Sequence, residues 1–224
     1  MNRSFGVILG VGLLAVLLAP SAHADVLVAP GAQASFWTLS AEPIGATETL
    51  GSNPFRFFNA AYFPDTASAG WVSMAATGNA SATGNYTYDL QVNLTGFNPA
   101  TTVISGTFGT DNDGSILLNG GAPVATTGFA SFGTPTPFTF NSGFIPGINT
   151  ITVIVNNASN PAAFFVQFSS TSGPVVHNTG VSAGVGVPTT PIPPTIFLTL
   201  GGLALVGFYF GFRGRFTART ATAQ

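Results

Sequence analysis

Few side chains in this sequence have the chemistry that a hydrolase needs. Glu42 and Glu48 lie close together in the chain, and most glycosidases use two carboxyl groups to cleave a glycosidic bond. Proline and glycine residues surround both, which favours their interpretation as loop residues. His177 stands in a stretch rich in Gly, Ser and Val, where we interpret it as a solvated linker residue and not as the base of a Ser-His-Asp triad. The sequence therefore predicts a protein that is not an enzyme.

Oxygen-bearing side chains form one candidate cation site. The run Asp111-Asn112-Asp113-Gly114 is similar to the start of an EF-hand loop, and Asn119 is the next oxygen donor along the chain. The Glu that closes such a loop is missing, and Asp-Gly between two alternating runs is also a strong hairpin signal. We therefore expect a plain hairpin turn and no cofactor; a structural Ca²⁺ held by Asp111, Asp113 and Asn119 is the alternative.

Aromatic rings with nearby amides are the candidates for binding a glycan. Sugar C–H faces pack on aromatic rings, and sugar hydroxyls need hydrogen-bond partners. Trp37 and Trp71 are the candidate rings, and Asn85, with Asn59 and Asn79, offers the amides. Large aromatic residues are also core residues, and the chain has no Cys, so a hydrophobic core must stabilise the fold. Burial of both tryptophans in that core is the alternative to a ligand-binding role.

The charge distribution excludes one large class of partner. Only 5% of the 224 residues are charged, against about a quarter in ordinary globular domains. Residues 25–183 contain Arg56 as their one Lys or Arg and seven carboxylates, which gives 1 − 7 = −6. Phosphate contacts require a basic face, so this part of the chain is not expected to bind nucleic acid.

Alternation of apolar and polar residues predicts β-strands through the middle of the chain. In residues 86–94 every second residue is apolar, which places one face of this strand in a core and the other in solvent. Turns with Gly, Pro and Asn separate further strands, and no helical periodicity lasts beyond a turn. The expected fold is an all-β antiparallel sandwich over residues 25–173, with a less regular aromatic stretch at 26–81 closing one end. The other expected strands are residues 102–109, 115–119, 138–141, 150–156 and 163–170.

The motifs that separate these strands carry a family resemblance. A "DN-x-G" turn ends at Gly114, an "LNG" sequence ends at Gly120, and a "PGxNxI" turn covers residues 146–151. In this order they resemble a galactose-binding-like jelly roll, and the resemblance covers about residues 70–170. It implies a jelly-roll β-sandwich, a fold found in sugar-binding domains and in many surface modules.

Both ends of the chain indicate export and anchoring. Residues 1–24 have the basic start, apolar middle and Ala-His-Ala end of a signal peptide, with cleavage expected after Ala24. Residues 195–212 are uncharged and long enough for a transmembrane helix, and a basic tail follows at 213–224. The positive-inside rule places this tail in the cytoplasm and the body outside, so we expect an inner-membrane anchor for an exported protein.

The linker between the body and this span has a distinctive composition. Residues 174–194 are rich in Gly and Pro, and a proline-rich peptide of this kind is extended and accessible. Together with the apolar span and the arginines, it resembles the PEP-CTERM sorting signal of Gram-negative bacteria. This resemblance implies recognition by an exosortase, release to the cell surface or matrix, and a link to exopolysaccharide and biofilm. The residues that carry it are Pro188, Pro191, Pro193, Pro194, Arg213 and Arg215.

These observations lead to one expected function and two alternatives. We expect a non-catalytic cell-envelope or extracellular-matrix protein that contacts polysaccharide or surface proteins. One alternative is a structural protein that associates with itself through neutral β surfaces. The other is a glycan-active enzyme that uses Glu42 and Glu48.

Overall fold

The computed structural model of the chain describes residues 25–183. The predicted signal peptide at 1–24, the apolar segment 195–212 and the six residues of the sorting-like motif lie outside the described residues. Within residues 25–183, no helix has the length and apolar character needed to cross a membrane. The helical structure of this part consists of η1 (Pro99–Thr101), a short 3-10 turn capped by Asn98.

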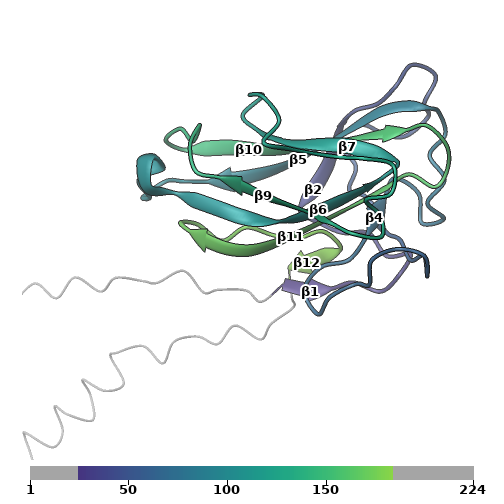
Figure 1. The fold of residues 1–224 in the computed structure, drawn as a ribbon, viewed down its shortest axis with the longest axis horizontal. Coiled ribbons are helices and arrows are strands. Elements are labelled where there is room, and N and C mark those ends of the chain that lie inside the picture. Colours follow the sequence, from purple (N-terminus) through teal and green to yellow (C-terminus); the bar gives the residue numbers. More distant parts are fainter. Residues whose placement is uncertain (1–24, 184–224) are drawn as a thin grey trace, which may run out of the picture. The chain divides into compact units, whose positions relative to one another are not determined.

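The described residues form an all-β fold with antiparallel sheets, which confirms the expected fold class. Two five-stranded sheets form two layers, and a separate two-stranded sheet lies beside them (Figure 1). The two-stranded sheet joins the first and last strands, β1 (Asp25–Leu27) and β12 (Val181–Ala183). One five-stranded sheet has the order β2 (Trp37–Ala41), β5 (Gly84–Asn93), β10 (Ile148–Asn157), β7 (Asp113–Leu118), β8 (Ala125–Thr127). The other five-stranded sheet has the order β3 (Phe55–Arg56), β4 (Val72–Ser73), β11 (Ala163–Ser172), β6 (Val103–Asp111), β9 (Thr136–Phe140).

The long strands lie where the alternation predicted them. β5 and β10 pair over their full length, from Gly84 opposite Asn157 to Asn93 opposite Ile148. Along β5 the residues of one face, such as Tyr86 and Leu90, are buried. This agrees with the pattern of residues 86–94, because successive side chains of a strand point to opposite faces. The other five predicted strands correspond to β6, β7, β9, β10 and β11 within a few residues at each end.

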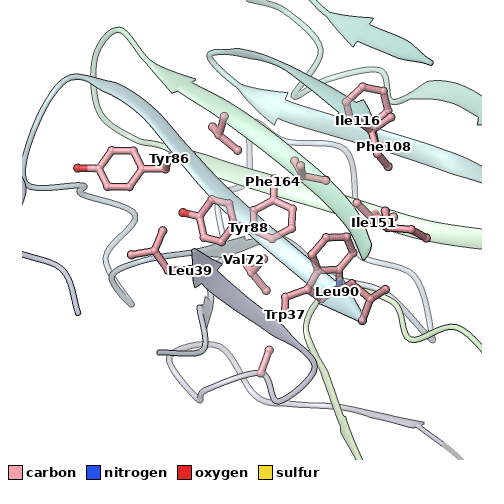
Figure 2. Close-up of a cluster of buried hydrophobic side chains, with 14 of the residues drawn as sticks. Trp37, Leu39, Val72, Tyr86, Tyr88, Leu90, Phe108, Ile116, Ile151 and Phe164 are labelled. Carbon is pink, nitrogen blue, oxygen red and sulfur yellow. The ribbon is translucent and has the colours of Figure 1, made fainter. Parts of the chain in front are cut away.

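The main core lies between the two five-stranded sheets. Phe164 of β11 meets the Tyr88 ring of β5 at a centroid distance of 4.4 Å and the Trp37 ring of β2 at 5.4 Å. All three side chains are almost completely buried, and Figure 2 shows them together with Val72 and Ile151. Full burial of one large apolar side chain contributes roughly 1.5–3 kcal/mol, so this layer supplies the stability that disulfides cannot.

The outer face of β11 is also covered. Phe164 and Val166 point into the sandwich core, whereas Ala163 and Phe165 contribute to a second buried cluster with Trp71. The segment of residues 57–71 packs over this outer face, and its rings make up most of the second cluster. We call this second buried cluster the outer cluster. It consists of Phe57, Tyr62, Ala69, Trp71, Ala163 and Phe165, with Phe63 and Phe132 packed against it.

The folded body continues past the predicted boundary at residue 173. β4 pairs with β11 only at Phe164, so the amides of Val166 and Phe168 on this side of β11 have no partner in β4. Thr179 Oγ1 accepts from Val166 N at 2.9 Å, and Asn178 Oδ1 accepts from Phe168 N at 2.7 Å. Buried amides need such partners, and the chain after residue 173 provides them before it pairs as β12 with β1.

His177 lies in this same stretch and is not the solvated linker residue that the sequence suggested. Its Nδ1 lies 2.9 Å from a carboxylate oxygen of Asp25, and its ring stacks on Phe36 at a centroid distance of 3.7 Å. The cause is the pairing of β1 with β12, which brings the two ends of the body together.

Candidate functional site

A pocket of about 240 Å³ lies in the outer cluster, over the segment that links β3 to β4. Of the residues that line it, Phe58, Ala60 and Pro64 are exposed, so the pocket opens to solvent. Sites for drug-sized ligands measure roughly 300–1,000 Å³, so this pocket suits a smaller group. Its aromatic walls are Phe57, Phe58, Tyr62, Phe63 and Trp71.

Two adjacent phenylalanines at this pocket differ in burial. Successive side chains of an extended chain point in opposite directions, so Phe57 and Phe58 cannot both be buried on one face. Phe57 is 6% exposed and packs on Gly78, where an added Cβ would lie 2.5 Å from its ring. Phe58 is 63% exposed and presents its ring at the pocket.

The polar atoms of Trp71 and Tyr62, the two buried rings of the pocket that carry one, are both used inside the protein. Trp71 Nε1 donates to the carbonyl oxygen of Phe63 at 2.8 Å, and the Tyr62 hydroxyl donates to the Asp111 carboxylate. The Tyr62 and Trp71 rings lie 4.7 Å apart at an angle of 59°. These rings therefore give the pocket apolar surface and no hydrogen-bonding groups.

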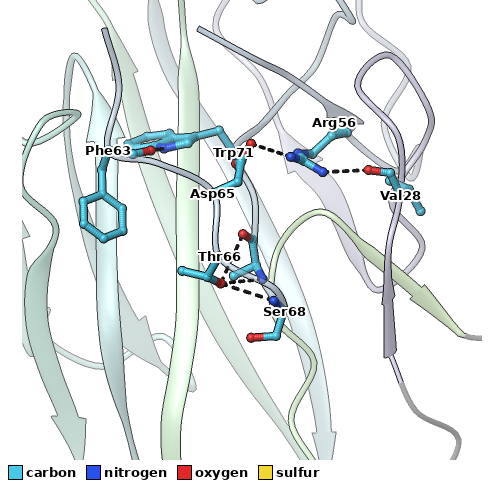
Figure 3. Close-up of polar contacts among 8 residues, drawn as sticks. Val28, Arg56, Phe63, Asp65, Thr66, Ser68 and Trp71 are labelled. Atoms are coloured by element: carbon cyan, nitrogen blue, oxygen red, sulfur yellow. Dashed lines mark hydrogen bonds and ion pairs between the residues drawn. The ribbon is translucent and has the colours of Figure 1, made fainter. Parts of the chain in front are cut away.

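A buried ion pair fixes the loop under the pocket. The Arg56 guanidinium pairs with the Asp65 carboxylate and donates to the carbonyl oxygen of Val28 at 2.6 Å, as Figure 3 shows. The other oxygen of Asp65 accepts from Trp71 N at 3.1 Å. A Cβ on Gly70 would overlap the guanidinium, so the close approach requires glycine there. Because both oxygens of Asp65 have partners, this side chain positions the loop and adds no free charge to the pocket.

Asn59 supplies the pocket with a free donor. Its side-chain oxygen accepts from Ala61 N at 3.0 Å, which holds the amide in place. Among the described residues, its side-chain nitrogen has no hydrogen-bond partner. An amide N–H held at the edge of an apolar pocket can donate to a hydroxyl of a bound ligand.

The structure places the predicted glycan-binding residues in different regions. Trp71 and Asn59 both line the pocket, but the Trp71 side chain is 2% exposed, so both tryptophans are buried, as the alternative interpretation had it. Trp37 is completely buried between the two sheets, so its ring offers no face to a ligand. Asn85 lies on β5 in the other sheet and pairs with Asn156 at 3.0 Å.

The predicted cation ligands are not brought together. Asp111 is buried against Tyr62 and Asn112, and Asp113 is exposed at the start of β7. Asn119 follows the other end of β7, about 20 Å away at 3.3 Å per residue, and bonds to Gly143 and Asn149. Between residues 25 and 183, no group of three or more His, Cys, Asp or Glu side chains could hold a metal ion.

The turn at Asn112 also differs from the predicted hairpin. β6 and β7 lie in different five-stranded sheets, so this turn carries the chain from one sheet to the other. Asn112 is buried, and its side-chain oxygen accepts from Ala158 N at 2.7 Å and Ser159 N at 3.0 Å. These bonds to a distant loop fix the turn, and the local Asp-Gly signal carries no information about them.

Glu48, one of the two carboxylates considered for catalysis, joins two loops. It accepts from Ser81 N at 2.7 Å and from Thr47 N at 3.1 Å. Partial burial acts to raise the pKa of Glu48, but these bonds and that of the Ser81 hydroxyl together lower it below its usual value. Glu42 lies partly buried in the same loop, and neither carboxylate lines the pocket.

The candidate site is therefore an open aromatic pocket with one amide donor and a neutralised carboxylate. Such a site can hold an apolar ring face and donate one hydrogen bond. Phe58 was not singled out from the sequence, although the Phe57-Phe58 pair in an extended stretch is a usable signal for an exposed ring. No protein-family model, curated protein or solved structure matches this chain.

Proposed function

We propose that this chain is an exported, non-catalytic protein of the cell envelope or extracellular matrix that contacts polysaccharide through the pocket in the outer cluster. The observation that carries the proposal is the Phe58 ring, which is 63% exposed beside the free amide of Asn59. What distinguishes Phe58 from other exposed rings such as Phe97 is its place in the wall of an open, mostly aromatic pocket with an amide beside it, which is the usual make-up of a small-ligand site.

The chemistry of the pocket fits a sugar. The C–H face of a pyranose ring packs on an aromatic side chain, and Phe58 offers such a face. A ring hydroxyl needs a polar partner, and the Asn59 amide lies in the same pocket. The Arg56–Asp65 pair holds the loop in place before a ligand arrives, which lowers the entropic cost of binding.

The proposed location in the cell is based on the sequences at the two ends of the chain. We propose a jelly-roll sandwich of the galactose-binding-like kind, anchored by residues 195–212 and sorted through the proline-rich motif by an exosortase.

Retention on immobilised polysaccharides tests the proposal. The full chain, purified in detergent, should bind at least one polysaccharide of a panel, and Phe58→Ala should weaken binding about tenfold or more because one ring face is lost. Phe97→Ala is the matched control, since Phe97 is 47% exposed in the turn after β5 and does not line the pocket. Absence of retention on every polysaccharide would contradict the function, and full retention by Phe58→Ala would contradict the site.

A further inference from the structure

We infer that the pocket takes a single neutral sugar residue and discriminates against acidic sugars. This inference rests on the proposed function, since it specifies the ligand of the same pocket. It follows from the size of the pocket and from the positions of the charged side chains of residues 25–183.

The volume limits the ligand to one ring. About 240 Å³ lies below the range of roughly 300–1,000 Å³ that drug-sized ligands occupy. The pocket also opens on the side where Phe58, Ala60 and Pro64 are exposed. A polymer can therefore place one residue in the pocket while the rest of its chain remains in solvent.

Among residues 25–183, no Arg, Lys or His is free to bind an acidic group at the pocket. Proteins hold carboxylates and sulfates mostly through Arg or Lys, and Arg56 is the one such side chain in residues 25–183. Arg56 is 5% exposed and is already bound to Asp65 and to the carbonyl oxygen of Val28. His177, the one histidine of this part, pairs with Asp25 and does not line the pocket.

The charges that remain repel an anion. Seven carboxylates against one arginine give residues 25–183 a formal charge of 1 − 7 = −6. Asp65 lines the pocket, and its partner Arg56 also donates to the carbonyl oxygen of Val28. A ligand carboxylate would therefore lie near the Asp65 carboxylate with no further cation to neutralise it. Long-range repulsion is screened beyond about 8 Å at physiological salt, but the missing partner inside the pocket is not replaced by salt.

A neutral residue meets none of these costs. Its hydroxyls need donors and acceptors, and the Asn59 amide provides a donor without a charge. Its C–H face replaces water on Phe58, where burial of apolar surface is favourable.

Matched polymers test the inference. Neutral glucan, galactan and mannan are each compared with their carboxymethylated forms for binding to the full chain in detergent. We expect the neutral member of the pair that binds to be held about tenfold more tightly, and Phe58→Ala to remove that difference. Equal or tighter binding of the acidic form would overturn the inference and leave the proposed function intact. Failure of all six polymers to bind would contradict the proposed function itself.

A gain of function provides the second test. Ala60 is exposed at the pocket and its side chain makes no hydrogen bonds, so Ala60→Arg adds a cation without removing one. This variant should bind the carboxymethylated polymer several times more tightly than the unmodified chain does, and Ala60→Gln should not. If both variants keep the original preference, the lack of a cation is not what sets the specificity.

Discussion

The two faces of β11 are both buried, but what covers them differs. On the inner face, Phe164 packs against rings from the opposite sheet, and the contacts are apolar. On the outer face, Phe165 lies under a segment without long strands, which polar pairs such as Arg56–Asp65 hold in position. Strands packed through a full layer leave no opening, whereas a loop fixed at a few polar points can leave a pocket. The same strand therefore supports the stable core on one side and the candidate site on the other.

The two tryptophans make this comparison measurable. The chain contains two Trp residues, and Trp37 lies in the inner core while Trp71 lies in the outer cluster. Trp71→Phe leaves a fluorescence signal from the inner core, and Trp37→Phe leaves one from the outer cluster. Unfolding followed in these two backgrounds reports each region separately.

The largest effect is expected at Phe164. Phe164→Ala removes a completely buried ring from the centre of the inner core and should cost roughly 3–5 kcal/mol of unfolding free energy. Both tryptophan signals should shift together in urea titrations, because the inner core supports the whole fold.

Phe165→Ala is the matched control for that substitution, because the neighbouring ring is equally buried on the other face. It should shift the Trp71 signal more than the Trp37 signal, since Phe165 contacts Trp71 at a centroid distance of 5.6 Å. If Phe165→Ala moves both signals as far as Phe164→Ala does, the two faces are not distinct in stability.

A somewhat smaller and more local effect is expected at Arg56. Arg56→Met leaves the Asp65 carboxylate without its cation and should cost about 3 kcal/mol, seen first in the Trp71 signal. Replacing both partners, as in Arg56→Met with Asp65→Leu, should recover much of this free energy because no uncompensated charge remains. The double variant should still bind polysaccharide poorly, since Trp71 N loses the oxygen that positions it. If the double variant regains stability and also binds polysaccharide as well as the unmodified chain does, the ion pair does not position the pocket.

The difference between the two faces also explains what the sequence could predict. β5 of the inner core alternates regularly from Tyr86 onward, so local pattern was enough to place it. The outer cluster has no period, because Phe165 packs under residues about a hundred positions earlier in the chain. The same limit applies after residue 173, where Asn178 and Thr179 act as strand partners through their side chains. At the site, Asn59 and Trp71 had been named as candidates and both line the pocket, although Trp71 is buried; the exposure of Phe58 depends on how Phe57 packs on Gly78.

The smallest effect is expected from a change of pH. Two carboxyl groups have a perturbed pKa: Glu48, which contacts Tyr86 of the inner core, and Asp111, which contacts Tyr62 of the outer cluster. Partial burial acts to raise the pKa of Glu48, but its bonds with Ser81 and with the amide of Thr47 together lower it. Asp111 bonds to Tyr62 in the outer cluster; burial raises its pKa, although the bonds from Tyr62 and Asn112 oppose the rise. The two groups should therefore make the stability depend on pH in opposite directions.

The sign follows from proton binding in the two states. A carboxyl group with a lowered folded pKa stabilises the fold above its unfolded value, so the advantage of the unmodified chain over Glu48→Gln should disappear as the pH falls below about 4.5. A carboxyl group with a raised folded pKa is more favourable when protonated, so the unmodified chain should lose stability relative to Asp111→Asn as the pH rises above about 3.8. Urea titrations between about pH 3 and pH 7 measure both differences. Slopes of the same sign for the two variants would mean that Glu48 and Asp111 do not differ in whether hydrogen bonding or burial dominates the pKa of the folded state.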